Sequence, residues 1–447
     1  MNLIPSDYST RKTHMLAQDL RAVVGRRSIE SNLKDVLYEQ QHRLDEYFET
    51  KELRFTKLDK ETKQKINYKD YAVLCKDVNG LIDYIMAERE LHDDNTLIRI
   101  GLDGGRGFMK ICLSVFDINN STESKKTFAK KFKNSGVKKL FILAIVPDLS
   151  ENFWNIKMLW TELQLSKLTK PYKLATDLKL CNILLGLQSH SSKHPCSWCD
   201  IDKSNLHIEG SIRTFGNLKA HYWSFFYSKA STKEAKEHGN AIHPSILTGD
   251  DNTPLVVILP TPELHLLLGT VNHICDKMEE LWPDVTQWFN GLHIQRTDYQ
   301  GGQFEGNDCC KLLKSVDKLI EICPVFVNKY AAVLKLFNDV VASSFGANLS
   351  VDYINKLAKF KDAYLKLGEI SVTPKVHAVF FHVEECLKFT NNSSHGLGLA
   401  PFSEQTIEAV HHDFKTIWKN YVIKKKDHPN YPNQLLRAVS AYNSQHI

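Results

Sequence analysis

The sequence predicts an α/β fold in which a mixed β-sheet comes first and a large α-helical segment follows. Between residues 96 and 187, short apolar stretches alternate with helical patterns in the order strand, strand, strand, helix, strand, helix. From about residue 190 to 400 the pattern changes to several helical stretches with little strand signal. Hydrophobic residues make up 43% of the chain and charged residues 24%, which is typical of a globular protein and excludes a disordered one.

These patterns divide the chain into four parts. Residues 1–92 are polar with apolar residues at helical spacing, most clearly over Ser28–Phe48, so we expect a helical N-terminal region. The first part of the sheet occupies 93–190, the helical segment 191–400, and a final helix with a C-terminal region 401–447. The predicted strands are 96–102, 108–116, 139–147 and 172–176; the predicted helices are one capped by Ser150, then 178–187, 262–283, 309–340, 351–367, 374–389 and 403–421.

Two aspartates stand where predicted strands end. Asp103 ends the first strand, before a glycine-rich turn, and Asp177 ends the fourth. A right-handed crossover places these strands side by side, about 4.8 Å apart, so both carboxylates would emerge at one sheet edge. Close carboxylates repel unless a cation lies between them, and Mg²⁺ is a natural occupant. The final helix offers Glu404 or Glu408 as a third ligand. In the simpler alternative, Asp103 starts a turn and Asp177 caps the next helix.

Cysteine and histidine pairs predict a second, structural metal site. Cys196 and Cys199 form a C-x2-C motif, and His377 and His382 form an H-x4-H pair. Two thiolates and two imidazoles make a closed tetrahedral zinc site. A redox-active dithiol is the competing interpretation of the cysteine pair. By itself, His265 is best explained as a structural histidine.

The charge distribution permits nucleic acid as a partner. The net charge is only +5, but lysines gather between Glu123 and Lys139 and again between Lys415 and Lys426. Solvated surface is the simpler explanation for either stretch alone. No apolar run reaches the roughly 18 residues of a membrane helix, so we expect no membrane association.

Taken in chain order, the motifs resemble those of one known family. They are Asp103-Gly-Gly, Asp177 nineteen positions before Cys196-x2-Cys199-Asp200, Leu264-His265-x3-Gly269, Gly306-Asn307 with Lys311-Leu312, His377-x4-His382, and Glu408 with Phe414 six positions later. Together they resemble the catalytic core of the recombination-activating endonuclease of antigen-receptor gene assembly and the related Transib transposases. The resemblance covers roughly residue 90 to the end. Cys310 stands where the family has an arginine.

The resemblance implies an RNase H-like fold with an α-helical insertion before the catalytic glutamate. It implies that Asp103, Asp177 and Glu408 hold two Mg²⁺ or Mn²⁺ ions, with Glu404 as a rival third ligand. It also implies a structural Zn²⁺ on Cys196, Cys199, His377 and His382, and active-site or DNA contacts from His265, Asn307 and Lys311.

The implied activity is that of a DDE transposase or recombinase in the nucleus. Such an enzyme nicks double-stranded DNA at element ends, forms a hairpin on the flanking DNA and transfers the excised strand to target DNA. Because two ends are cut together, a homodimer is expected. Two alternatives remain: a catalytically inactive, domesticated DNA-binding protein, and an RNase H-like nuclease without strand transfer.

Overall fold

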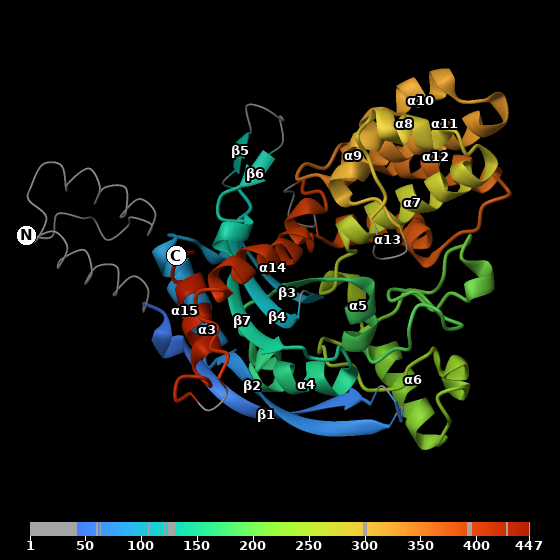
Figure 1. Cartoon of the computed structure of the whole chain (residues 1–447). Coiled ribbons are helices and arrows are strands. Elements are labelled where there is room, and N and C mark those ends of the chain that lie inside the picture. The colour runs from blue at the N-terminus through green and yellow to red at the C-terminus, as the bar shows by residue number, and fades with distance from the viewer. Residues whose placement is uncertain are drawn as a thin grey trace, which may run out of the picture. The chain divides into compact units, whose positions relative to one another are not determined.

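The computed structural model describes residues 43–446 apart from 60, 63, 106, 120, 124–129, 298–301, 391–395 and 426–427. The described residues belong to two compact units, whose elements are labelled in Figure 1. The first unit contains residues up to 117, with 134–171 and 406–447, and the second contains 118–133 and 172–405. Each unit is therefore discontinuous in sequence.

An antiparallel sheet forms the centre of the first unit (Figure 1). Its strands lie in the order β1 (Phe48–Leu58), β2 (Lys65–Cys75), β7 (Phe141–Pro147), β4 (Phe108–Asp117) and β3 (Thr96–Gly105). β3 and β4 form a hairpin, and β7 joins this hairpin to the long β1–β2 pair. β7 and β4 are buried along nearly their whole length, which explains their continuous apolar sequences.

The described residues of the first unit also form the α-helices α3 (Val78–Glu88), α4 (Phe153–Glu162), α14 (Gln405–Trp418) and α15 (Gln434–Asn443). α14 lies directly on β3, since a Cβ atom on Gly101 would meet the Ile407 Cδ1 atom at 1.9 Å. α15 packs against β1, β2 and β7. The Asn443 side chain there accepts a hydrogen bond from the Ile142 backbone N–H (2.8 Å) and donates one to its carbonyl (3.0 Å).

The second unit is mainly helical. Its elements are β5 (Ser121–Glu123), β6 (Lys130–Phe132), β8 (Lys173–Thr176), α5 (Leu178–Leu185), α6 (Phe215–Tyr227), α7 (Glu263–Leu281), α8 (Val285–Gly291), α9 (Gly306–Lys314), α10 (Val316–Ile322), α11 (Val325–Val340), α12 (Tyr353–Lys366) and α13 (Pro374–Thr390). Helices α7, α11, α12 and α13 pack against one another. Aromatic rings of α11, α12 and α13 meet in their core, where the Phe360 ring lies 5.0 Å from Phe337 and 5.7 Å from Phe380.

The α/β class and the helix-rich character of residues 190–400 are confirmed. The expected helical N-terminal region is wrong for residues 48–75, which form β1 and β2, while residues 1–42 lie outside the described part of the chain. Ser150 does not cap α4, because the Asn152 side chain does so by accepting from the Asn155 N–H (3.0 Å). The predicted helix 309–340 is three helices, and the predicted helix 403–421 is α14, which begins at Gln405, ends at Trp418 and is followed by α15. Among the described residues, no helix has the length and apolarity needed to cross a membrane.

Candidate metal centre and carboxylate sites

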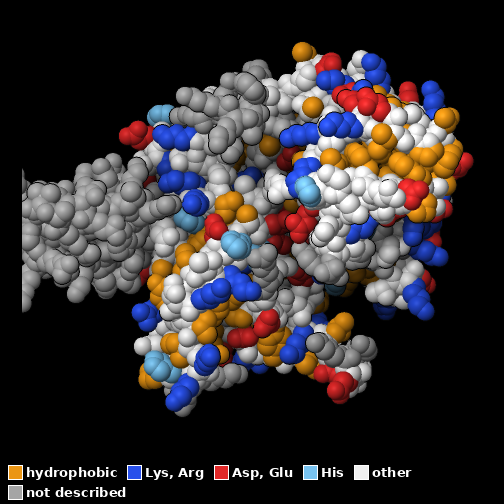
Figure 2. Space-filling model, turned by 45° about the horizontal axis from the view of Figure 1, so that its top comes forward, with side chains coloured by type: hydrophobic (Ala, Val, Ile, Leu, Met, Phe, Trp, Pro, Cys, Tyr) orange, Lys and Arg blue, Asp and Glu red, His pale blue; other side chains and the backbone are white. Residues whose placement is uncertain are grey.

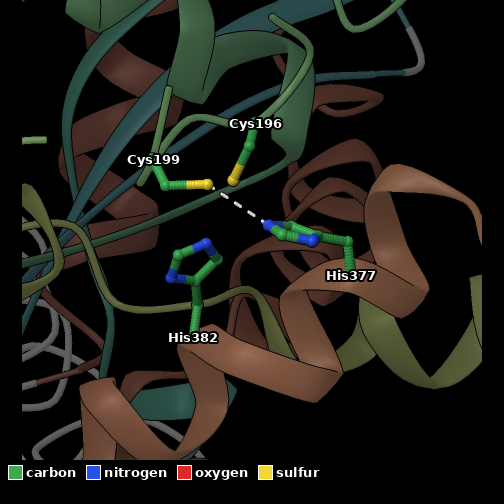
Figure 3. Close-up of side chains that lie close together, drawn as sticks. All are labelled: Cys196, Cys199, His377 and His382. Carbon is green, nitrogen blue, oxygen red and sulfur yellow. Dashed lines mark hydrogen bonds between the residues drawn. The ribbon is translucent and has the colours of Figure 1, made fainter. Parts of the chain in front are cut away.

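The two cysteines and two histidines of the predicted metal site converge in the second unit (Figure 3). Cys196 and Cys199 lie in the segment after α5, and His377 and His382 lie on α13. The four ligand atoms are all within 4.8 Å of one another, and all four residues are buried. The cluster can therefore hold a metal ion, as the spacing of the two motifs predicts.

Hydrogen bonds around the cluster orient both imidazoles. The His377 Nδ1–H donates to the Leu206 carbonyl (2.8 Å), and the His382 Nδ1–H donates to the Glu385 carboxylate (2.7 Å). The Nε2 atom of each ring is then left for the cluster, where His377 Nε2 lies 3.2 Å from the Cys199 sulfur. The buried His382 Nε2 has no hydrogen bond of normal geometry among the described residues. Such outer hydrogen bonds are typical of metal-binding histidines.

The two cysteines of the cluster differ, because the hydrogen bond with Cys196 raises the pKa of Cys199 to about 11, whereas the surroundings of Cys196 favour its thiolate. Burial alone would raise the pKa of Cys196, but hydrogen bonds from Cys199 and from the Trp198 N–H outweigh it and lower this pKa. The buried Arg213 guanidinium, held by the Cys199 carbonyl (2.8 Å), adds a positive charge that favours thiolate. Four protein ligands leave no open position, so the bound metal would be structural, and thiolate with imidazole suits Zn²⁺.

The first unit holds Asp103 and Glu408. Asp103 lies within β3 opposite Lys110, so the strand does not stop at the aspartate but continues to Gly105. The Asp103 Oδ2 atom accepts a hydrogen bond from His411 Nε2 (2.5 Å), and His411 Nδ1 contacts the buried Lys110 ammonium. Glu408 is exposed on α14, one turn before His411. Neither His411 nor Lys110 is predicted, although a lysine inside an apolar strand was a usable signal.

The second unit holds Asp177 and Glu404. Asp177 caps α5, accepting a hydrogen bond from the Leu180 N–H through Oδ1 (2.6 Å), as the simpler alternative expects, and this cap leaves Oδ2 for a ligand. Glu404 is 3% exposed and precedes α14 instead of lying on it. Its Oε1 accepts from the His265 backbone N–H (3.0 Å) and Nδ1 (2.8 Å). The buried Oε2 has no hydrogen-bond partner among the described residues.

Asp177 and Glu404 lie near the same buried thiol. After burial itself, these two carboxylates raise the pKa of Cys181 well above its usual value. His265 is thus hydrogen-bonded to the buried Glu404, and the candidate metal ligand Asp177 lies near the same thiol as Glu404. Its ring also borders a cavity of about 610 Å³ that Asp177 lines. His265 is thus hydrogen-bonded as expected of a structural histidine, and it also lines the cavity.

The remaining predicted contacts lie away from this cavity. Asn307 and Lys311 are exposed on α9, and the Lys311 ammonium pairs with Asp308 (2.9 Å). Of the lysine stretches, residues 124–129 and Lys426 lie outside the described part of the chain. On the face shown in Figure 2, Lys and Arg side chains occur in several separate groups, not in one continuous patch.

Comparison with protein-family models and with curated proteins finds no match for the chain.

Proposed function

We propose that the chain is a DDE-type DNA transposase or recombinase with an RNase H-like core and a zinc-stabilised helical insertion. The observation that carries the proposal is the convergence of Cys196 and Cys199 with His377 and His382. The resemblance requires this pairing across most of the helical segment, and the described structure contains it. The order and spacing of the other motifs support the same family.

In this proposal Asp103, Asp177 and Glu408 bind the divalent metals. Magnesium, when bound, supplies Lewis acidity for in-line displacement at phosphorus. Within the first unit, α14 lies on β3, and the His411 hydrogen bond fixes one Asp103 oxygen, which leaves Oδ1 for a ligand. Within the second unit, the helix cap fixes one Asp177 oxygen in the same way. Each aspartate is thus held in one orientation before any metal arrives.

The proposed substrates and partners follow from the reaction. Double-stranded DNA supplies the phosphodiester and, after nicking, the 3′-hydroxyl that attacks the second strand. The lysine stretches between Glu123 and Lys139 and between Lys415 and Lys426 would bind backbone phosphates, so affinity should fall steeply with salt. A homodimer acting in the nucleus would cut two element ends together.

One observation favours a second candidate, a catalytically inactive DNA-binding descendant. The Asp103 carboxylate is already bonded to His411, which in turn contacts the buried Lys110 ammonium. Positive charge at this position competes with a divalent cation for the carboxylate. An inactive descendant would keep the zinc-stabilised fold and DNA binding, without metal-dependent nicking.

Nicking of supercoiled DNA in Mg²⁺ or Mn²⁺ separates these candidates. We expect the wild-type protein to nick, and Asp103→Asn, Asp177→Asn and Glu408→Gln each to lose at least about 100-fold in rate while still binding DNA. Glu404→Gln should lose far less, since a glutamine oxygen can still accept from His265. Glu321→Gln, at an exposed position of α10, is the matched control.

Wild-type protein that binds DNA but never nicks would support the inactive descendant. A larger loss in Glu404→Gln than in Glu408→Gln would exchange the roles of the two glutamates. Nicking without joining of 3′-ends, together with a need for a 2′-hydroxyl, would indicate an RNase H-like nuclease instead.

A further inference from the structure

The cavity of about 610 Å³ in the second unit is bordered by the beginnings of two helices and by one face of a third. Asp177 stands at the start of α5, Lys375 stands at the start of α13, and His265 and His273 line the wall from α7. The cavity therefore combines a proposed metal ligand with basic side chains. Lys375 is the new element here, because no motif of the sequence pointed to it.

The Lys375 side chain crosses the α7 backbone at Gly269. A Cβ atom on Gly269 would lie 2.0 Å from the Lys375 Cδ atom and 3.0 Å from its Cβ atom. Any larger residue at position 269 would displace the lysine stem. Gly269 thus allows the half-buried methylene chain of Lys375 to lie against α7, and Lys375 also lines the cavity.

Asp177 acts on the Lys375 ammonium electrostatically without forming an ion pair with it. Among the described residues, no carboxylate lies within ion-pair distance (4.0 Å) of the Lys375 ammonium. Asp276, on the same cavity wall, is instead paired with Arg296 (2.7 Å). One oxygen of the Asp177 carboxylate accepts the hydrogen bond that caps α5, and the carboxylate acts on Lys375 electrostatically. A partly buried ammonium without a partner is costly, and an anionic ligand in the cavity would remove that cost.

The metal cluster fixes the start of α13, where Lys375 lies. His377, two residues further on, is a cluster ligand, and its backbone N–H donates to the Thr373 carbonyl (2.8 Å). The Thr373 hydroxyl also accepts a hydrogen bond from the Val376 N–H (3.3 Å). The turn that carries Lys375 is thus held on both sides, which pre-organises its charge.

We infer that Lys375 is a substrate-binding residue whose ammonium contacts a non-bridging oxygen of a DNA phosphodiester lying beside Asp177. This inference rests on the proposed function and names a further residue of its site. A lysine suits the task because it presents a compact point charge to a phosphate oxygen. No bond is made or broken by Lys375, so its contribution is to bind and orient the phosphate.

The test measures binding of the full-length protein to a short labelled DNA duplex over a range of salt concentrations, without Mg²⁺. Lys375→Gln should weaken binding and reduce the slope of log K against log [salt] by about 0.9, the loss of one phosphate contact. Lys375→Arg should restore the slope. Lys359→Gln removes the same charge from an exposed position on α12 and should leave the slope unchanged.

Zinc content and melting temperature of each variant show that the fold is kept. An unchanged slope in Lys375→Gln, an equal change in Lys359→Gln, or no DNA binding by the wild-type protein would overturn the inference. Nicking is scored separately. A wild-type protein that binds DNA with the expected Lys375 dependence but never nicks would refute the proposed enzyme and leave the phosphate contact standing.

Discussion

Replacing Cys196 by serine is expected to remove the metal and destabilise the second unit. The four ligand residues are at most 3% exposed, so without a metal their polar atoms stay buried and poorly satisfied. An unsatisfied buried group costs about 1–3 kcal/mol, and the His382 Nε2 atom, which has no hydrogen-bond partner among the described residues, is one such group. The binding free energy of a structural zinc ion, about 10–16 kcal/mol in small zinc domains, makes this a lower bound.

A loss of about 3 kcal/mol lowers the melting temperature by roughly 6–12 °C in a domain of this size. Elemental mass spectrometry should find stoichiometric zinc in the wild-type protein and almost none in Cys196→Ser. Circular dichroism or scanning calorimetry then measures the melting temperature of the full chain. Cys323→Ser, outside the cluster and in the same unit, serves as the control and should keep both zinc and stability.

Wild-type protein without stoichiometric zinc would refute a structural zinc site at the four residues. The site would equally be refuted if Cys196→Ser kept its zinc, or lost zinc without any fall in melting temperature. In the last case the ion would be adventitious, and the fold of the second unit would not depend on it.

Two further predictions concern the first unit. Burial lowers the pKa of His446 to about 4, below its ordinary 6.5, so stability is fully present above pH 6.5 and lost as pH falls toward 4. The loss of stability approaches about 3 kcal/mol. Urea unfolding of the wild-type protein at neutral and acid pH should show this loss. An identical pH profile of stability in His446→Gln would contradict the prediction. Gly101→Ala should cost about 1–3 kcal/mol, because the new methyl group meets Ile407. Denaturant unfolding measures this, and Gly101→Ala should cost less when it is made in the Ile407→Ala background. No loss in the wild-type background, or an equal loss in both backgrounds, would argue against close packing of α14 on β3.

The strands that the sequence predicts correctly are those buried on both faces. β4 and β7 keep an apolar residue at almost every position, and such a run is visible without knowledge of the fold. β1 differs, because Phe48, Leu53 and Phe55 are buried while charged residues stand between and around them. Its partner β2 is exposed over its first half. The apolar residues of β1 and β2 show neither a clear helical period nor a clear alternating one. The pairing of the two strands with each other therefore determines their structure.

The candidate sites show the same division. The cysteines and histidines are predictable because thiolate and imidazole pairs have a metal-binding chemistry that does not depend on the surrounding fold. The contact between His411 and Asp103 is different, because it arises only when α14 packs on β3. The pairing of Glu404 with His265 likewise depends on tertiary structure. Sequence spacing carries no information about such contacts, so these partners had to come from the structure.

The discontinuity of the first unit has a consequence for protein synthesis. Its sheet is complete in sequence once β7 has been translated, yet β3 and β7 still lack α14 and α15, which come from the last forty or so residues. The ribosome makes the whole helical unit before those covering helices emerge. Until then the apolar surface around Ile142 and Gly101 is not covered by α15 and α14. A premature stop codon before α14 would thus produce a chain whose sheet exposes apolar surface. Chaperones and proteases recognise such surface.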